Sequence, residues 1–338
     1  MTIRFGIVGC GYIANRHARH IVDHPGAQLI SAFDIDADKC EKYSSEYGAK
    51  PSDTLQELVS HPEIDILTIC TPYGNHHEIA IQALEGGKHV LVEKPMALSK
   101  AQCQQMIAAA ESNDRLLFVV KQNRFNPPVQ ALKRLIDENR LGKLYMVNLN
   151  CYWNRNEAYY TNSAWKGTKD LDGGTLFTQF SHFVDIFYYL FGDIEPLSGV
   201  IANQNHQGLI EFEDTGCFTF RFNSGALGNF AYTTAAYDRN MEGSISVFAE
   251  NATIKIGGKY LNTIDYQATN GFNISDLPIS GPANNYGHYE GSMSNHDKII
   301  HNVVETLNGR ESIMTNAHEG MKVVEIIEKF YRIGELRS

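Results

Sequence analysis

The strongest constraint on the fold is a glycine-rich segment near the start of the chain. A short apolar run ends at Gly9, and Gly11 and Ala14 complete a G-x-G-x-x-A pattern before helix-forming sequence. The first glycine permits a tight turn, the second lets the backbone approach a pyrophosphate, and the small third residue lets helix and strand pack closely. The first helical N–H groups, from Tyr12 and Ile13, then face the phosphates. The segment predicts a dinucleotide-binding unit.

An acidic residue falls where such a unit needs one. Residues 27–34 have the pattern of the next strand, and Asp34 ends it. A carboxylate there accepts hydrogen bonds from the adenosine ribose and would repel the 2′-phosphate of NADP. No Arg follows Asp34 directly, so the pattern predicts NAD. The alternative is a glycine turn and a strand-ending Asp with no ligand.

Composition narrows the class of protein. A chain of 338 residues is long for one core, so we expect two domains. The formal charge of −10 argues against a nucleic-acid-binding surface. No apolar run is long enough to span a bilayer, and the first residues do not resemble a signal peptide. The 6 cysteines form no C-x-x-C pair or zinc spacing, so we expect reduced thiols, a cytoplasmic location and no metal site.

The first part of the chain alternates strand and helix. Further strands are predicted at residues 65–71, 89–93 and 116–120, with helical segments between them. This order indicates an α/β fold with a parallel sheet, whose ligands bind at the carboxyl ends of the strands. Three polar clusters fall at those ends: Thr71, Pro72, Asn75 and His76; Glu93 and Lys94; and Lys121, Gln122, Asn123 and Arg124.

Lys94 directly follows an apolar strand and lies between a carboxylate, Glu93, and a proline. A lysine in this position can hydrogen-bond a substrate hydroxyl and, if partly desolvated, transfer a proton. The alternative is a surface lysine that forms an ion pair with Glu93.

The pattern changes after Arg124. Residues 129–138 read as a helix and 144–152 as a strand, and residues 153–167 read as a wet, aromatic-rich loop. The loop combines Tyr159, Tyr160 and Trp165 with Arg155 and Lys166, a set that suits ring stacking and the pairing of phosphate oxygens. The alternative is an aromatic loop that packs on the sheet or at a subunit contact.

An apolar helix is predicted from about residue 175 to residue 191. Thr178, His182 and Asp185 share one face of it by their spacing, and Gln179 is adjacent. A buried helix carries such groups only where they have partners. Histidine is the usual proton-transfer group near neutral pH, so His182 is a candidate base. The alternative is a His–Asp pair satisfied within the core.

The remainder of the chain is rich in β structure. Alternating runs at residues 209–213, 217–222, 226–233, 244–249 and 253–256 predict an open, largely antiparallel sheet. Residues 265–290 read as a long loop, and residues 299–307 and 317–333 as amphipathic helices. A sheet with one uncovered face predicts a homo-oligomer, either dimer or tetramer.

These motifs resemble, in order, those of the Gfo/Idh/MocA oxidoreductases. The resemblance rests on G-x-G-x-x-A, Cys70-Thr71-Pro72 with Asn75 and His76, Glu93-Lys94-Pro95, and Gly173-Gly174 leading to His182 and Asp185. It implies an NAD-binding Rossmann domain over residues 1–122. It also implies an α/β domain over residues 123–338 that binds substrate and mediates oligomerisation, with the last helix able to pack back on the first domain.

A narrower likeness is to bacterial UDP-N-acetylglucosaminuronate 3-dehydrogenases, which serve O-antigen diamino-sugar synthesis. It rests on residues 121–129, 153–167 and 175–185, although many relatives carry Asp or Asn at the position of Thr178 and Gly at that of Phe180. It implies that NAD oxidises C3 of a UDP-sugar acid. His182 would be the base, Lys94 the proton relay (or the reverse), and Asp185 would orient His182.

The remaining contacts are assigned by the same likeness. Arg155 and Lys166 would bind the diphosphate or carboxylate, and Tyr159 and Tyr160 would contact rings. Gln179, Thr178 and Asn123 would hold the sugar, and Gln122 and Trp165 the cofactor. A 2-oxoacid is a candidate hydride acceptor. The alternatives are an inositol or free-sugar dehydrogenase, a redox-neutral NAD-dependent hydrolase or epimerase, and a non-catalytic NAD-binding sensor.

Overall fold

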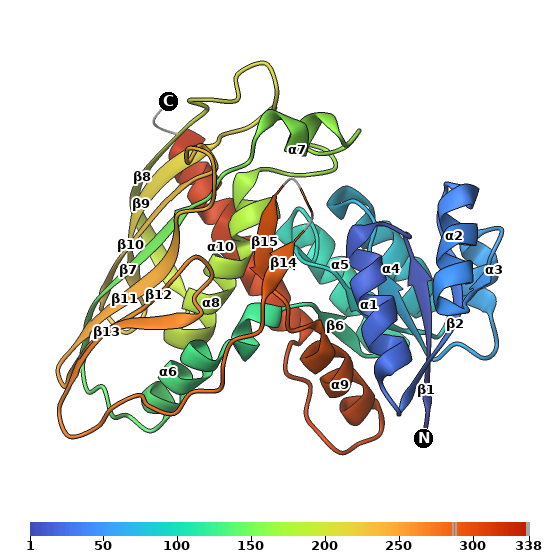
Figure 1. The fold of residues 1–338 in the computed structure, drawn as a ribbon, viewed down its shortest axis with the longest axis horizontal. Coiled ribbons are helices and arrows are strands. Elements are labelled where there is room, and N and C mark those ends of the chain that lie inside the picture. Colours follow the sequence, from blue (N-terminus) through green and yellow to red (C-terminus); the bar gives the residue numbers. More distant parts are fainter. Residues whose placement is uncertain (286, 288, 336–338) are drawn as a thin grey trace. The chain divides into compact units, whose positions relative to one another are not determined.

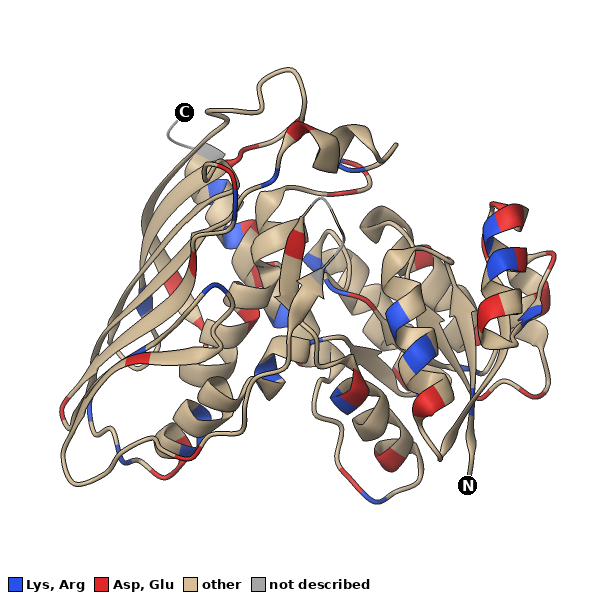
Figure 2. Ribbon diagram, in the orientation of Figure 1, with Lys and Arg blue, Asp and Glu red and all other residues tan. Residues whose placement is uncertain are grey.

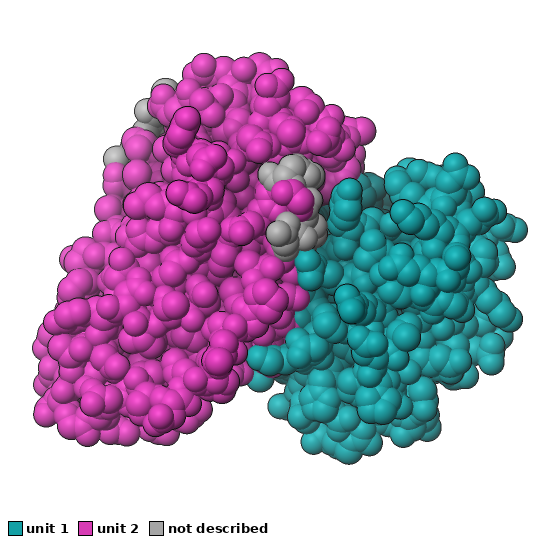
Figure 3. Space-filling model, in the orientation of Figure 1, with its two compact units in different colours: residues 1–121, 296–324 teal, residues 122–295, 325–338 magenta. Residues whose placement is uncertain are grey.

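A computed structural model describes residues 1–285, 287 and 289–335. The chain forms two compact units, drawn in two colours in Figure 3. Unit 1 contains residues 1–121 and 296–324, and unit 2 contains residues 122–295 and the end of the chain from residue 325. Figure 1 labels most of the helices and strands of both units.

Unit 1 is built on a six-stranded sheet of order β3-β2-β1-β4-β5-β6, in which every pairing is parallel. Its strands are β1 (Ile3–Val8), β2 (Ala27–Phe33), β3 (Lys50–Pro51), β4 (Ile66–Ile69), β5 (His89–Val92) and β6 (Leu117–Val119). Its helices are α1 (Tyr12–Asp23), α2 (Ala37–Tyr47), α3 (Leu55–Ser60), η1 (Tyr73–Asn75), α4 (His76–Glu85), α5 (Lys100–Ser112), α9 (His296–Leu307) and the first part of α10 (Ala317–Glu335). The predicted alternation and parallel sheet are confirmed, and β3 is an addition.

Local signals explain where these elements begin and end. Asp36 caps α2 by accepting a hydrogen bond from the Lys39 N–H, and Gly48 closes the helix with φ of 72°. Gly9, at φ 89°, ends β1 where a Cβ would lie 3.0 Å from the Cys70 carbonyl oxygen. Only glycine therefore fits this turn without strain.

Unit 2 contains a seven-stranded sheet of order β13-β12-β11-β7-β10-β9-β8. Only the β7–β10 pairing is parallel, so the prediction of a mostly antiparallel sheet is confirmed. Its strands are β7 (Leu144–Tyr152), β8 (Ile194–Ala202), β9 (Thr215–Phe222), β10 (Leu227–Thr233), β11 (Glu242–Ala249), β12 (Ala252–Gly257) and β13 (Thr263–Thr269). The other elements are η2 (Gln122–Phe125), α6 (Pro127–Asp137), α7 (Glu157–Thr161), η3 (Leu176–Phe180), α8 (Ser181–Phe191) and the hairpin β14 (Ala283–Asn285) with β15 (Glu290–Met293).

One face of this sheet packs against helices. Phe218 of β9 lies with its ring centroid 4.4 Å from that of Phe330 on α10, and Phe220 stacks on Phe187 of α8 at 5.4 Å. The burial of β9 alternates strictly along its second half, so its other side chains point away from this core. The outward face exposes Leu197, Val200, Leu227 and Met146, and β7 to β10 carry few charged residues (Figure 2).

Several predicted elements of unit 2 are wrong. Residues 209–213 form no strand, whereas β8 was not predicted. The loop expected at 265–290 contains most of β13, all of β14 and the start of β15, and its residues 286 and 288 lie outside the described residues. The loop expected to be wet begins with a buried Trp153, which packs on Phe180, Phe183 and Tyr260. In this last loop, burial of the Trp153 ring outweighed the local polarity on which the prediction relied.

Candidate active site

The glycine turn of unit 1 has the shape that a dinucleotide needs. Asp34 accepts hydrogen bonds from the N–H groups of Cys10 at 2.7 Å and Asp36 at 2.9 Å, which fixes its carboxylate beside the turn. Gly11 is the N-cap of α1 without a side-chain cap, and a Cβ built on it meets no atom within 4 Å. Tyr12 is 72% exposed at the first turn. The space beside Gly11 and the exposed helix start fit a bound pyrophosphate.

The polar clusters at the ends of β4 and β5 are tied together by His76. This residue is fully buried, with Nδ1 2.9 Å from the Pro95 carbonyl oxygen and Nε2 3.1 Å from that of Thr71. Burial lowers its pKa, although both carbonyl contacts act to raise it. The side chain of His76 therefore braces the backbone of two loops, beside Pro72 and the exposed Asn75.

Lys94 is half-buried at the end of β5, with Nζ 5.6 Å from the ring centroid of Tyr73. The backbone N–H of Lys94 donates a hydrogen bond to Glu93 Oε2 at 3.1 Å. Glu93 Oε1 lies 2.7 Å from Nε2 of His17, on α1. Glu93 is therefore a buried carboxylate with a histidine partner.

A second histidine, His296, completes this cluster, with Nε2 3.6 Å from Glu93 Oε1. The ligating atoms of His17, Glu93 and His296 lie within 4.8 Å of one another, a set that could hold a divalent metal. The 2.7 Å contact between His17 and Glu93 is that of a hydrogen bond. Because that contact is shorter than two ligands of one tetrahedral zinc would allow, we interpret it as a hydrogen bond between His17 and Glu93, with His296 packed beside it.

In unit 2, η2 and α8 bring several predicted residues together. Gln122 Nε2 donates to Ser292 Oγ at 3.0 Å, and the same hydroxyl lies 3.3 Å from His182 Nε2. Arg124 pairs with Asp185 through two contacts of 2.9 and 2.6 Å. Asn123 is buried beside them. Asp185 therefore binds a guanidinium, a partner that the sequence did not predict, and its role toward His182 stays a prediction.

The helix predicted from residue 175 is not one regular α-helix. Residues Leu176–Phe180 form a π-helix, and α8 follows from Ser181. The wider turn changes the spacing assumed for Thr178 and His182, and π segments are frequent at functional sites. Gly174, at φ 135°, precedes it where a Cβ would lie 2.2 Å from the hydroxyl oxygen of Tyr331.

The other predicted substrate contacts gather around Arg155. Its Nε donates to Gln179 Oε1 at 2.7 Å, and Gln179 Nε2 donates to the Tyr159 hydroxyl at 2.7 Å. Lys166 Nζ lies 3.9 Å from the ring centroid of Tyr159 and 5.0 Å from that of Tyr289. Burial lowers the pKa of Lys166 to about 8. Arg155 and Tyr159 are buried, whereas Lys166 and Trp165 are half-buried.

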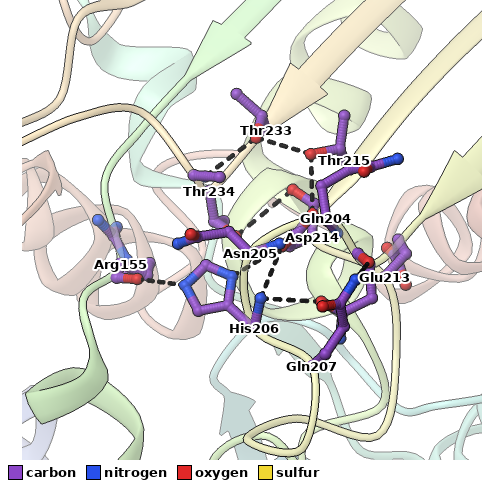
Figure 4. Close-up of polar contacts among 12 residues, drawn as sticks. Arg155, Gln204, Asn205, His206, Gln207, Glu213, Asp214, Thr215, Thr233 and Thr234 are labelled. Carbon is purple, nitrogen blue, oxygen red and sulfur yellow. Dashed lines mark hydrogen bonds and ion pairs between the residues drawn. The ribbon is translucent and has the colours of Figure 1, made fainter.

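Figure 4 shows the polar network behind Arg155. His206 Nδ1 lies 2.9 Å from Asp214 Oδ2, and its Nε2 lies 2.7 Å from the Arg155 carbonyl oxygen. Burial lowers the pKa of His206, but the bonds to Asp214 and Arg155 outweigh it and leave that pKa raised. Tyr160 packs edge-on against the His206 ring. A cavity of about 830 Å³ opens here, lined by residues 154–157, 205–209 and 235–238.

The sequence did not identify several of these residues. His17, His296 and Tyr289 lie far apart in the chain, and His206 and Asp214 lie in one loop; no local spacing links any of them to the motifs. The one available signal was the unusual position of His17, a polar residue on the apolar face of α1, beside Ala14, Ala18 and Ile21.

Comparisons with known proteins follow the same two parts of the chain. A model of the Gfo/Idh/MocA oxidoreductase family with an NAD-binding Rossmann fold matches residues 3–121, and a model of its C-terminal domain matches residues 129–255. A crystal structure of the WlbA dehydrogenase from Bordetella pertussis, in complex with NADH and UDP-GlcNAcA, is 32% identical with a TM-score of 0.88. The alignment covers 99% of this chain and 97% of that one.

Two curated relatives match less of this chain than the WlbA dehydrogenase does. An uncharacterised oxidoreductase from Streptococcus pneumoniae is 32% identical over 61% of this chain, and the match spans only 55% of that protein's length. The myo-inositol 2-dehydrogenase of Thermotoga maritima is 27% identical over 74% of this chain and 75% of that protein. Among the described residues, no helix is long and apolar enough to cross a membrane.

Proposed function

Because this chain belongs to the Gfo/Idh/MocA oxidoreductase family, with its NAD-binding Rossmann fold, we propose that it oxidises a ring hydroxyl of a nucleotide-sugar acid. Family membership confirms the predicted oxidoreductase class and the predicted NAD cofactor. The proposed substrate is UDP-N-acetylglucosaminuronate, and the proposed product is its 3-keto derivative. Such a ketone would be the substrate of a later amination that leads to the diamino sugars of O-antigen.

The observation that carries this proposal is the cationic cluster of unit 2. Arg155 and Lys166 lie around Tyr159, with Gln179 bound to both Arg155 and the Tyr159 hydroxyl. Two cations suit a diphosphate or a carboxylate, whereas an uncharged polyol requires neither. The WlbA dehydrogenase that this chain resembles was crystallised with UDP-GlcNAcA, an anionic sugar of this class.

In the proposed reaction, the C3–H bond breaks and its electron pair leaves as hydride while the C3 hydroxyl loses its proton. When bound, NAD accepts the hydride. His182 takes the hydroxyl proton, and Lys94 hydrogen-bonds the same oxygen and relays the proton toward solvent. Gln179 and Thr178 hold neighbouring hydroxyls. Asp34 and the turn at Gly9 and Gly11 bind the adenosine ribose and the pyrophosphate.

A substrate panel tests this proposal. The protein is mixed with NAD and either UDP-N-acetylglucosaminuronate, UDP-N-acetylglucosamine or myo-inositol, with and without a 2-oxoacid, and the absorbance of reduced nicotinamide is followed. We expect a signal with the nucleotide-sugar acid alone. A signal that stops below one equivalent unless a 2-oxoacid is added would indicate that the cofactor is reoxidised in place. A signal with myo-inositol alone would reject the substrate class and favour the polyol dehydrogenase.

Lys94→Ala tests the proton-transfer assignment. We expect turnover to fall by roughly a hundredfold or more if Lys94 takes part in proton transfer. Near-wild-type turnover in this variant would reject the role.

The outward face of the unit 2 sheet supports a second part of the proposal. Leu197, Val200 and Leu227 are exposed on β8 and β10, and large exposed apolar faces commonly mark association surfaces. We therefore expect a dimer or tetramer, which sedimentation equilibrium can measure. A monomer at micromolar concentration would contradict this expectation.

A further inference from the structure

We propose that His17 and His296 are positioning residues for Lys94 and act on it through the buried carboxylate of Glu93. This inference rests on the proposed function, because it gives Lys94 a reason to be held in place. Neither histidine is among the site residues predicted from the sequence.

The carboxylate of Glu93 is buried beside two histidines. Glu93 is 4% exposed, and an unpaired carboxylate in such a place would take up a proton. Burial raises the pKa of Glu93, but the hydrogen bond from His17 and the nearby His296 outweigh burial and hold it well below its usual range. Glu93 is therefore an anion with histidine partners.

The two carboxylate oxygens of Glu93 contact different groups. Oε1 faces both histidines, with His17 Nε2 at 2.7 Å and His296 Nε2 at 3.6 Å. Oε2 accepts the Lys94 N–H at 3.1 Å. The hydrogen bond of His17 and the packing of His296 against the His17 ring fix one oxygen of Glu93. The rigid carboxylate then fixes its other oxygen, and with it the backbone from which the Lys94 side chain departs.

His76 contacts the same backbone on the other side of Lys94. His76 Nδ1 lies 2.9 Å from the carbonyl oxygen of Pro95, the residue after Lys94. The segment 93–95 is therefore held from Glu93 on one side and from His76 on the other. Such double support suits a side chain that must be placed within a fraction of an ångström for proton transfer.

The two histidines belong to different helices. His17 lies on α1, the helix that starts at the glycine turn, and His296 is the first residue of α9. Both are fully buried, and their rings meet edge-on with centroids 5.1 Å apart. The cluster thus joins the helix of the dinucleotide turn to the strand that carries Lys94.

His17→Leu and His17→Gln test the inference, because Gln retains a donor at the position of Nε2. We expect His17→Leu to lower kcat by about tenfold or more with little change in KM for the sugar or in Kd for NADH, and His17→Gln to recover most of the loss. His318→Leu, at a side chain 66% exposed, is the matched control. If His17→Leu does not fold, His296→Leu and Glu93→Gln are measured instead.

Hydrogen exchange of residues 93–98 gives a readout that does not depend on activity. We expect faster exchange of the Lys94 amide in His17→Leu, and exchange close to wild type in His17→Gln. Wild-type kcat and wild-type exchange in His17→Leu would overturn the inference, as would a loss of kcat that His17→Gln does not restore. An inactive wild-type protein would instead reject the proposed function, while the exchange result would still decide the role of His17.

Discussion

The ion pair between Arg124 and Asp185 offers a prediction whose magnitude follows from the structure. Arg124 comes from η2 and Asp185 from α8, the helix that carries His182. Their side chains are only 1% and 2% exposed, and two hydrogen bonds join them. Removing one partner of such a pair leaves an uncompensated buried charge and costs about 3–5 kcal/mol.

We therefore expect Arg124→Met to lower the free energy of unfolding by about 3–5 kcal/mol, or the melting temperature by about 6–20 °C for a unit of this size. The double variant Arg124→Met/Asp185→Leu, which buries no charge, should recover most of that loss. Arg134→Met, at an exposed position of α6, is the control and should stay within about 0.5 kcal/mol of wild type.

The assay is urea unfolding followed by circular dichroism, with calorimetry to separate the transitions of the two units. An Arg124→Met variant within about 1 kcal/mol of the wild-type stability would contradict this expectation, as would a double variant as unstable as the single one. Activity of the double variant also tests whether Asp185 orients His182, because a stable but inactive protein would support that role.

Two further predictions concern pH. Burial lowers the pKa of Lys166 to about 8, so the KM for the anionic sugar should rise as the pH increases through that value. Lys166→Arg should make this rise smaller, because arginine stays charged. A KM that changes neither with pH nor in the variant would exclude Lys166 from anion binding. Burial raises the pKa of Glu213 from 4.5 to about 7. The folded state then binds the proton more tightly than the unfolded state does. Glu213 therefore contributes about 3 kcal/mol to the free energy of unfolding below its pKa in the unfolded chain, and this contribution is lost as the pH rises to 7. Glu213→Gln should lose less stability than wild type between pH 5 and about 7.5 in urea unfolding, and an identical pH dependence would contradict the assignment.

The parallel sheet of unit 1 could be predicted because its signals are local. The turn at Gly9 and Gly11, the cap at Asp36 and the apolar strand before Glu93 each act within a few residues. The NAD cofactor was predicted from Asp34, and the family and the oxidoreductase class from the resemblance of four ordered motifs; all three are confirmed.

The partners of the candidate residues could not be predicted, because they depend on contacts between distant parts of the chain. His17 and Glu93 are 76 residues apart, and Arg124 and Asp185 are 61 apart. The π-helix at Leu176–Phe180 was also not predicted, because one wider turn hardly changes the 3.6-residue periodicity of apolar residues. The assigned site roles, the domain boundaries and the cytoplasmic location stay predictions.

The fate of the hydrogen on C3 tests the proposed oxidation most directly. UDP-N-acetylglucosaminuronate labelled with deuterium at C3 is incubated with the protein and NAD, and the mass of the reduced cofactor is measured. We predict that the reduced cofactor carries the deuterium and that the sugar becomes a ketone without it. A reduced cofactor free of deuterium, or a labelled sugar recovered unchanged while the protein oxidises myo-inositol, would contradict the account.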